Sequence, residues 1–474
     1  MPQPKQQLMM ERGEFEALYG GAAGGGKSDY LLAEMLRQVQ IPHYRAIIFR
    51  RTYPELADLI DRSNELYKQA FPKAVYNKTE HSWRFPSGSK IYFGSMQYES
   101  DRTKYQGRHF DVVGFDELTH FTAEQYLYMF ARARPSGPGT MVYIRSTANP
   151  GGVGHGWVKE RFISVAPPGT PVISTTEIKG PDGKKIRVSK DRIFIPSRVW
   201  DNQALLENNP DYVGNLAMMP EALRKAMLDG DWDSFSGQVF KEWRNNPGGY
   251  ESQQWTHVIE PFRIPDGWIL VRGYDFGYAK PFSVGWYAVD YHGCLYRIRE
   301  LYGCVEGSYN VGTQIDPGEQ ARQIKEIEST DENLKGRKIL GIADPSIFDR
   351  SRGESIADIM EKEGVSWIPG DNHRIPGKMQ YHYRMAFDAQ GRSMFYVFRT
   401  CKHFIRTIPS LVYDEKHVED IDTTQEDHIY DECRYILMQY MIPQRKNVKK
   451  EPPWEDPLDL HKQERERAYR VIRI

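Results

Sequence analysis

The chain has 474 residues, of which 40% are hydrophobic and 27% are charged, a composition typical of globular proteins with sizeable cores. It carries 63 Lys and Arg against 64 Asp and Glu, and the net charge of -1 excludes a globally basic nucleic-acid coat, although not a local basic groove. Because the sequence has no long apolar run, no apolar leader and no CxxC pair, we expect a multidomain protein of a reducing intracellular compartment, not a membrane protein.

The first 235 residues are predicted to form one α/β domain. Strand patterns alternate with helical patterns, and the strands are predicted over 15–19, 46–49, 112–115 and 141–145. Such alternation is typical of a mostly parallel sheet. Two further β-like runs within 168–198 flank a GPDG turn signal, which predicts a β-hairpin inserted into this domain.

A second α/β domain is predicted over 268–442. Its strands over 269–278 and 339–344 each contain or end in an acid. The segment between the domains, 236–267, is punctuated by Pro and Gly and is predicted to be a linker. The last residues, 443–474, alternate basic and acidic side chains, which predicts an exposed charged tail.

A phosphate-binding loop is predicted over residues 21–28, GAAGGGKS, which fit the pattern GxxxxGK[ST] at every fixed position. The loop follows a predicted strand and opens a predicted helix, as this motif requires. Gly21 and Gly26 let backbone N–H groups surround phosphate oxygens. Lys27 would reach the β- and γ-phosphates, and Ser28 would hold Mg²⁺. A chance Gly-rich turn would not explain the flanking strand and helix.

Two adjacent acids follow the strand over 112–115. Asp116 would coordinate Mg²⁺ through water and Glu117 would polarise the attacking water, which favours an ATPase over a kinase or a GTP switch. Ser146 and Thr147 follow the next strand and would lie at the same edge of a parallel sheet. They could sense the γ-phosphate, but an ordinary strand-to-turn cap explains them equally well.

Four acids of the second domain are candidates for a metal site. Asp275 and Asp344 end strands, and Asp427 and Asp431 flank the start of a predicted helix. Carboxylates at neighbouring strand ends can converge on two divalent ions, which activate water and stabilise the leaving oxygen in phosphodiester cleavage. Mg²⁺ and Mn²⁺ suit such oxygen ligands. Because Asp is also common at turns and helix caps, both interpretations stay open from the residues alone.

From about Pro4 to Met441 the sequence resembles the large terminase subunit of tailed double-stranded DNA bacteriophages. Four stretches in order carry the resemblance: YGGAAGGGKS at 19–28, FRRTYPEL at 49–56, FDELT at 115–119 and NPGGVGHGWVK at 149–159. The resemblance implies an N-terminal ASCE-type P-loop ATPase joined to a C-terminal RNase H-like nuclease. Such a protein packages viral DNA into a procapsid with ATP and Mg²⁺, and cuts concatemeric DNA with Mg²⁺ or Mn²⁺.

The resemblance also implies residue roles. In the ATPase they are an adenine contact at Gln6, the Walker A pair Lys27 and Ser28, the Walker B acid Asp116, the catalytic Glu117, and coupling-motif positions Ser146 and Thr147. In the nuclease, Asp275 and Asp344 match the first two metal-binding acids, and Asp431 is preferred to Asp427 as the third. Residues 22–25 lack the arginine that some family members carry there, so the activating arginine is sought among Arg50, Arg51, Arg102 and Arg108, in cis or from a neighbouring subunit.

The partners implied by the family are double-stranded DNA, the portal protein, a small terminase subunit and further copies of the chain in a ring on the procapsid. The implied location is the host cell cytoplasm, outside the mature virion and without a membrane. Two other hypotheses stay open: a cellular helicase-like or repair ATPase–nuclease, and a nucleotide-gated scaffold whose acids bind no metal. The NPGGVGH stretch at 149–155 favours the terminase hypothesis over both.

Overall fold

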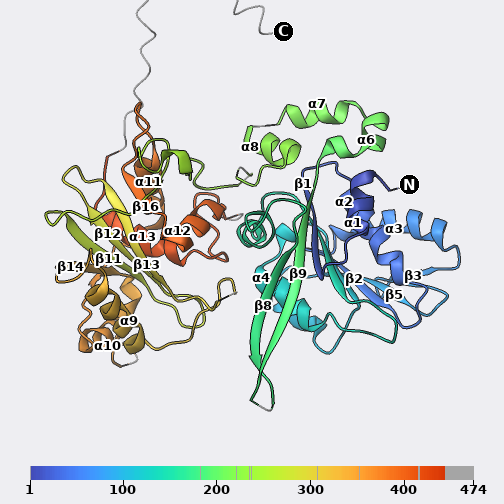
Figure 1. Ribbon diagram of the computed structural model, residues 1–474, viewed down its shortest axis with the longest axis horizontal. Helices are drawn as coiled ribbons and strands as arrows, with labels where there is room; N and C mark the ends of the chain where they lie inside the picture. The colour runs from blue at the N-terminus through green and yellow to red at the C-terminus, as the bar shows by residue number, and fades with distance from the viewer. Residues whose placement is uncertain are drawn as a thin grey trace, which may run out of the picture.

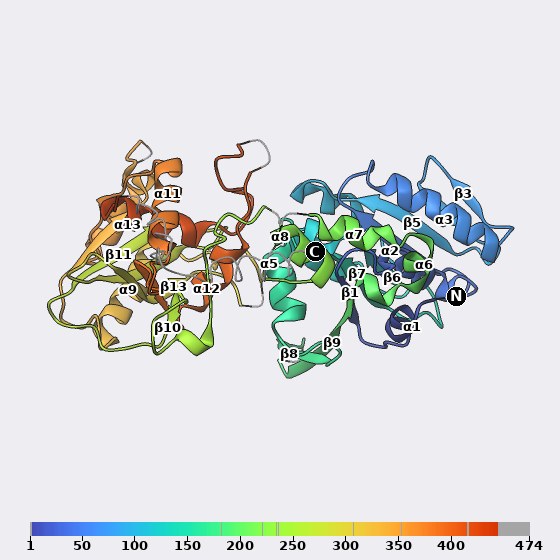
Figure 2. The same ribbon diagram turned by 90° about the horizontal axis from the view of Figure 1, so that it is seen from above.

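The computed structural model describes residues 2–443, apart from 182, 220, 234, 236, 307, 352, 415 and 416. Two mixed α/β bodies lie side by side, the first running from blue to green and the second from yellow to red (Figures 1 and 2). Apart from its first residue, the predicted tail 443–474 lies outside the described residues. None of the described helices combines the length and apolar character that crossing a membrane requires.

The first body is built on one sheet, whose described strands follow the order β3-β4-β5-β2-β6-β7-β1-β9-β8. These strands are β1 (Glu16–Gly21), β2 (Arg45–Arg50), β3 (Val75–Asn77), β4 (Ser82–Arg84), β5 (Lys90–Ser95), β6 (Val112–Phe115), β7 (Tyr143–Ala148), β8 (Val172–Lys179) and β9 (Lys185–Ser197). The six strands from β5 to β9 in this order are parallel, and the edge strands are antiparallel. Because β7 lies between β1 and β6, this is the strand order of ASCE-type P-loop folds, and the predicted fold is confirmed.

Helices cover both faces of this sheet. They are α1 (Pro4–Met10), α2 (Lys27–Met35), α3 (Leu56–Ala70), α4 (Ala123–Tyr128), α5 (His155–Val158), α6 (Gln203–Asn208), α7 (Asp211–Ala217) and α8 (Glu221–Arg224). Because successive strand residues point to opposite faces, Ala17 and Tyr19 of β1 pack with residues of α2 and α3, while Leu18 packs with residues of α4 and α5. The sheet is therefore buried on both sides, as a parallel sheet requires.

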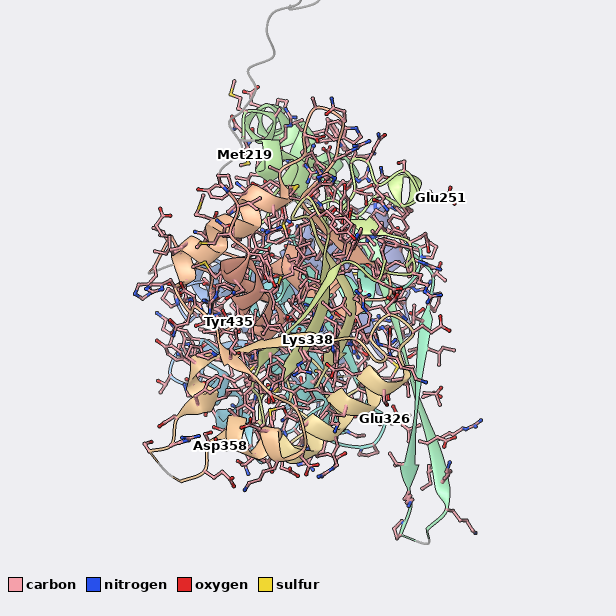
Figure 3. The ribbon with its side chains drawn as sticks, turned by 90° about the vertical axis from the view of Figure 1, so that its left-hand side faces the viewer. Met219, Glu251, Glu326, Lys338, Asp358 and Tyr435 are labelled. Carbon is pink, nitrogen blue, oxygen red and sulfur yellow. The ribbon has the colours of Figure 1, made fainter. Side chains whose placement is uncertain are left out.

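The predicted hairpin over 168–198 is only partly an appendage. Its outer part, where β8 pairs with β9, projects away from the body (Figures 1 and 3). The last residues of β9, from Arg192 to Ser197, pair in parallel with β1 and belong to the main sheet. Strand β9 therefore reaches the phosphate-binding loop, which follows β1.

The second body contains a sheet in the order β10-β16-β13-β12-β11-β14-β15. Its described strands are β10 (Val258–Ile259), β11 (Ile269–Asp275), β12 (Ser283–Val289), β13 (Leu295–Tyr302), β14 (Ile339–Ala343), β15 (Ile368–Pro369) and β16 (Phe395–Phe398). Its described helices are α9 (Pro317–Thr330), α10 (Ile356–Lys362), α11 (Arg374–Met385), α12 (Lys402–Thr407) and α13 (His428–Gln439). Strands β11, β12 and β13 form an antiparallel meander, and β14 and β15 continue parallel to β11. This is the RNase H-like arrangement that was predicted.

The segment predicted to be a linker, 236–267, belongs largely to the second body. Phe240 and Trp243 are buried in its core, and β10 extends its sheet by pairing with β16. The prediction of a linker was based on Pro and Gly residues, which interrupt helices and long strands. Such residues do not prevent the apolar side chains between them from being buried. The linker prediction is therefore wrong for most of this segment.

Candidate functional site

The phosphate-binding loop joins the end of β1 to the start of α2. Gly26 caps α2 with φ 68°, a left-handed conformation that glycine adopts without strain. A Cβ at Gly26 would lie 2.6 Å from the side-chain nitrogen of Gln6, which donates a hydrogen bond of 2.7 Å to the Gly26 carbonyl. Lys27 is buried and donates to the carbonyl of Ala22. Burial lowers the pKa of Lys27, against the opposing charges of Glu117 and Asp116.

The last residue of β9 and the segment after this strand hold the same loop in place. The hydroxyl of Ser197 donates to the Gly25 carbonyl at 3.0 Å, and the side-chain amide of Asn202 donates to the Gly24 carbonyl at 2.8 Å. The Ala22 N–H donates to the Ser197 carbonyl at 3.1 Å. Sequence reasoning missed Ser197 and Asn202, because nothing local marks a residue that lies more than 170 positions from its partner.

The Walker B acid Asp116 is fully buried and receives polar contacts from three elements. Its carboxylate accepts hydrogen bonds from the Thr147 hydroxyl at 2.5 Å, the Arg50 Nε at 2.7 Å and the Ser28 hydroxyl at 3.3 Å. The predicted pair Ser28 and Asp116 is thus brought together. A hydroxyl beside a carboxylate is the donor set that holds Mg²⁺ in P-loop proteins, so the chemistry of these residues fits this ion.

Glu117 lies next to Asp116 in a left-handed conformation, with φ 56° and ψ 61°. Such a backbone is costly for a residue other than glycine and is concentrated at functional sites. Asn149 holds both carboxylate oxygens of Glu117, through its backbone N–H at 3.2 Å and its side-chain amide at 3.0 Å. The acid is therefore oriented from the end of β7, the strand next to β6.

Strand β7 brings only one of its two predicted residues to this site. The strand extends to Ala148, so Ser146 and Thr147 lie within it and point to opposite faces. Thr147 contacts Asp116 on the face of α2. Ser146 is on the other face with Ile144 and Ala148, which pack against the cluster containing α4. This position does not agree with the predicted contact between Ser146 and the nucleotide.

Three of the four candidate arginines are engaged within the chain. Arg50 pairs with Asp116, Arg51 donates to the His120 carbonyl at 2.6 Å, and Arg102 pairs with Glu99 and Glu124. Arg108 is exposed, and its guanidinium lies 4.6 Å from the ring centre of Tyr92. Arg108 is therefore the candidate best placed to reach a neighbouring molecule.

His155 connects the segment after β7 to the chain that leads into the second body. Its Nδ1 accepts from the Gly151 N–H at 3.0 Å, its Nε2 lies 3.1 Å from the Trp232 carbonyl, and its ring stacks on Trp232 and Phe235. Burial lowers the pKa of this histidine to about 3. Its two hydrogen-bond partners suit the neutral ring with the proton on Nε2.

Because His155 is buried as a neutral ring, we expect acid to destabilise the fold. Between the unfolded pKa of about 6.5 and the folded pKa, the unfolded state binds more protons, so stability falls as the pH is lowered. We expect a loss of about 2 kcal/mol from pH 7 to pH 5 through His155. Urea unfolding at both pH values should show a smaller pH dependence in His155→Gln than in the wild type. A surface control, His292→Gln, should keep the wild-type dependence. An equal dependence in His155→Gln would contradict this assignment.

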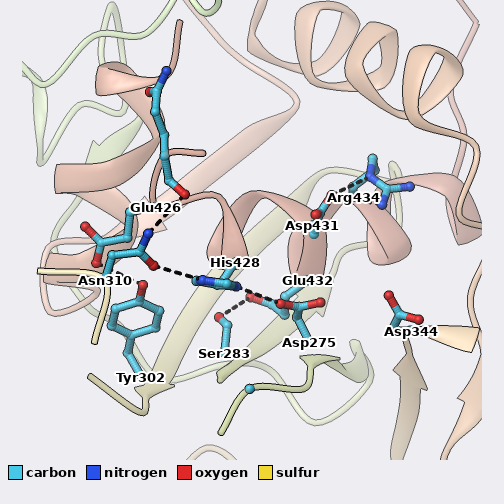
Figure 4. A network of polar contacts seen from close by, with 12 residues as sticks. Asp275, Ser283, Tyr302, Asn310, Asp344, Glu426, His428, Asp431, Glu432 and Arg434 are labelled. Atoms are coloured by element: carbon cyan, nitrogen blue, oxygen red, sulfur yellow. Dashed lines mark hydrogen bonds and ion pairs between the residues drawn. The ribbon is translucent and has the colours of Figure 1, made fainter. Parts of the chain in front are cut away.

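The acids of the second body gather where β11 and β14 end and α13 begins (Figure 4). Asp275 ends β11 and Asp344 follows β14, and these adjacent strands are parallel. The carboxylate of Asp344 accepts a hydrogen bond of 2.5 Å from the Tyr435 hydroxyl. The carboxylate of Asp275 lies 3.2 Å from the Nδ1 of His428. Sequence reasoning missed His428 and Tyr435, although a histidine directly after Asp427 was a visible signal.

The pKa values of two acids rise because negative charge is concentrated in this buried region. Burial, together with Asp431 and Asp344, raises the pKa of Asp275 to about 6, against the opposing effect of His428. Burial, Asp431 and Asp275 raise the pKa of Asp427 to about 8. This oxygen chemistry suits a divalent cation. Within the described residues, however, no three His, Cys, Asp or Glu side chains are placed to hold one metal ion jointly.

The two candidates for the third acid differ in their partners. Asp431 forms ion pairs with Arg374 at 3.2 Å and with Arg434 at 2.9 Å. Asp427 is 7% exposed, and no donor among the described residues hydrogen-bonds its carboxyl. The carboxylate of Asp431, which the sequence preferred, is thus paired with two arginines, whereas the carboxyl of Asp427 is buried without such a partner among the described residues.

The fold and these two sites define a P-loop NTPase-like body joined to an RNase H-like body. Residues 18–242, a little under half of the chain, match the family model described as terminase large subunit, T4likevirus-type, N-terminal. This match is confined to the N-terminal body and is to the family that the sequence motifs resemble. No curated protein matches the sequence.

Several solved terminase structures are similar to this chain. The large terminase of a thermophilic bacteriophage is 17% identical, with 94% of this chain and 100% of that chain covered and a TM-score of 0.40. The HK97 bacteriophage large terminase is 10% identical, with 92% and 94% covered and a TM-score of 0.45. The P22 large terminase nuclease domain is 19% identical, with 43% and 92% covered and a TM-score of 0.32. The fold of both bodies is defined by the strand orders of their sheets.

Proposed function

We propose that this protein is an ATP-driven motor that packages double-stranded viral DNA into a procapsid and cuts concatemeric DNA with a metal-dependent endonuclease. The observation that carries the proposal is the convergence of Lys27, Ser28, Asp116 and Glu117 at the end of one parallel sheet. The family match over 18–242 supports the packaging role. The cluster of acids in an RNase H-like fold supports the nuclease.

In the ATPase body, Lys27 would leave Ala22 and bind the β- and γ-phosphates, while Gln6 would contact the adenine. Ser28 and Asp116 would hold Mg²⁺, which would supply positive charge against the phosphate oxygens. Glu117 would accept a proton from the attacking water. Its hydrogen bonds to Asn149 support this role, because they fix the direction of the carboxylate.

In the nuclease body, Asp275, Asp344 and Asp427 would supply oxygen ligands to Mg²⁺ or Mn²⁺. A divalent cation bound there supplies activation of water and stabilisation of the leaving oxygen in phosphodiester cleavage. The raised pKa values of Asp275 and Asp427 support this assignment, since a cation would offset the repulsion between the carboxylates. Asp431 would instead anchor Arg374 and Arg434 beside the site.

The partners that we propose are double-stranded DNA, the portal protein, a small terminase subunit and further copies of the chain in a ring, all in the host cell cytoplasm. A ring would allow one subunit to offer an arginine to the nucleotide of its neighbour. The exposure of Arg108, close in sequence to β6, supports its candidacy for this role. Binding to DNA should rely on phosphate contacts and weaken as salt is raised.

ATP turnover by Lys27→Ala tests the nucleotide site. Removing the cation that stabilises the γ-phosphate should lower turnover at least about 100-fold. The exposed control Lys73→Ala should turn over ATP at the wild-type rate, and thermal unfolding should show that both variants are folded. Substantial hydrolysis by folded Lys27→Ala would overturn the assignment of the loop.

A further inference from the structure

The loop that follows β13 faces the first body. The ring of Tyr309 in this loop lies 6.1 Å from the ring of Trp157, which belongs to α5 of the first body. The next residue, Asn310, lines a cavity of about 360 Å³ between the two bodies, together with Lys280, Glu124 and other residues. Lys280 and Glu124 form an ion pair of 3.3 Å across this interface. Asn310 is therefore at the boundary between the ATPase body and the nuclease body.

The backbone of Asn310 is left-handed, with φ 57°, a conformation that asparagine tolerates better than most residues. Its side chain bridges two parts of the second body (Figure 4). The amide nitrogen donates to the Gln425 carbonyl at 3.3 Å, and the amide oxygen lies 3.0 Å from the Nε2 of His428. Asn310 thus contacts the residues on both sides of the acidic pair formed by Glu426 and Asp427.

His428 transmits this contact to the first nuclease acid. It is the first residue of α13, and its Nδ1 lies 3.2 Å from the carboxylate of Asp275. The Asn310 oxygen and the Asp275 oxygen lie within hydrogen-bond distance of the two ring nitrogens, so contacts on both sides fix the ring plane. Without Asn310, the ring would be held at one point and could turn away from Asp275.

The segment before Asp427 is held from the same side. Glu426 pairs with Arg406 at 2.5 Å and accepts a hydrogen bond of 2.9 Å from the Tyr302 hydroxyl. Together with the bond from Asn310 to Gln425, these contacts fix the chain as it enters α13. The loop at the boundary therefore contacts the supports of two of the three proposed metal ligands, Asp275 and Asp427.

We propose that Asn310 is a positioning residue of the nuclease site, which fixes His428 against Asp275 and the chain before Asp427 from the wall that faces the ATPase body. This inference rests on the proposed nuclease function. Groups that orient metal ligands without touching the metal commonly change metal affinity or activity by about 10- to 100-fold.

The test compares three variants of the full chain with the wild type. Asn310→Gly keeps the left-handed backbone and removes both side-chain bonds, whereas Asn310→Asp keeps an oxygen for His428. Gln314→Gly is the matched control, because Gln314 lies in the same loop with the same φ of 57° and an exposed side chain. Three quantities are measured. The dissociation constant for Mn²⁺ is obtained by titration calorimetry, and the rate of Mn²⁺-dependent cleavage is obtained on supercoiled plasmid. The rate of ATP turnover checks that the first body is unaffected.

We expect Asn310→Gly to bind Mn²⁺ about 10- to 100-fold more weakly and to cleave correspondingly slowly, with ATP turnover unchanged. Asn310→Asp should recover much of both losses, and Gln314→Gly should match the wild type. Wild-type Mn²⁺ affinity and cleavage in Asn310→Gly would overturn the role of Asn310 and leave the nuclease assignment intact. A wild-type chain that neither binds Mn²⁺ nor cleaves DNA would overturn both.

Discussion

Replacing Glu117 by Gln should leave ATP binding intact and lower ATP turnover by about 100-fold or more. The amide has the size of the carboxylate, so the loop and the phosphates keep their contacts. An uncharged amide cannot accept the proton of the attacking water. The rate of ATP turnover should therefore fall while the dissociation constant for ATP stays unchanged. Both quantities can be measured on the same preparation.

Glu65, an exposed residue that forms an ion pair with Arg62, provides the control. Glu65→Gln makes the same chemical change far from the loop. Its turnover should equal that of the wild type. Turnover near the wild-type rate in Glu117→Gln would mean that the proton acceptor lies elsewhere. Loss of ATP binding together with turnover would mean that Glu117 supports the loop structurally.

The second large effect is expected at the nuclease acids. Asp427→Asn should reduce Mn²⁺-dependent plasmid cleavage by at least about 100-fold, because loss of a metal ligand exceeds the 10- to 100-fold cost of changing its supports. Asp431→Asn should lower the cleavage rate less, because the carboxylate of Asp431 is already paired with Arg374 and Arg434. It should instead lower the thermal stability, because one buried and one half-buried guanidinium group lose a charged partner.

These two variants are each other's control, since the same change is made one helical turn apart. The cleavage rates and the thermal unfolding midpoints should therefore rank them in opposite orders. A larger loss of cleavage in Asp431→Asn, with its stability unchanged, would restore Asp431 as the third ligand and contradict the argument from its ion pairs.

The sequence was sufficient wherever the chemistry is local. The spacing within 21–28 and the apolar strand before Asp116 depend on neighbours in the chain, and the structure brings Ser28 and Asp116 together as expected. The mostly parallel character of the first sheet also followed, because alternation of strands and helices favours parallel pairing. The acids that end β11 and follow β14 were recognised because each ends a strand pattern in the sequence.

Long-range contacts could not be predicted in this way. The choice between Asp427 and Asp431 depends on Arg374, which reaches the site from α11. The position of Ser146 depends on where β7 ends. Because the strand continues to Ala148, Ser146 lies within it and faces away from α2. The burial of Phe240 and Trp243 depends on a core assembled from the rest of the second body. Each of these depends on residues that are distant in sequence.

If one chain joins an ATPase to a metal-dependent nuclease, plasmid cleavage tests the nuclease most directly. Wild type and Asp344→Ala should be compared with Mn²⁺ present, beside Asp349→Ala, which removes a nearby exposed acid. We expect cleavage by the wild type and by Asp349→Ala, and none by Asp344→Ala. Equal cleavage by all three, or by none, would contradict the assignment of these acids as a nuclease centre.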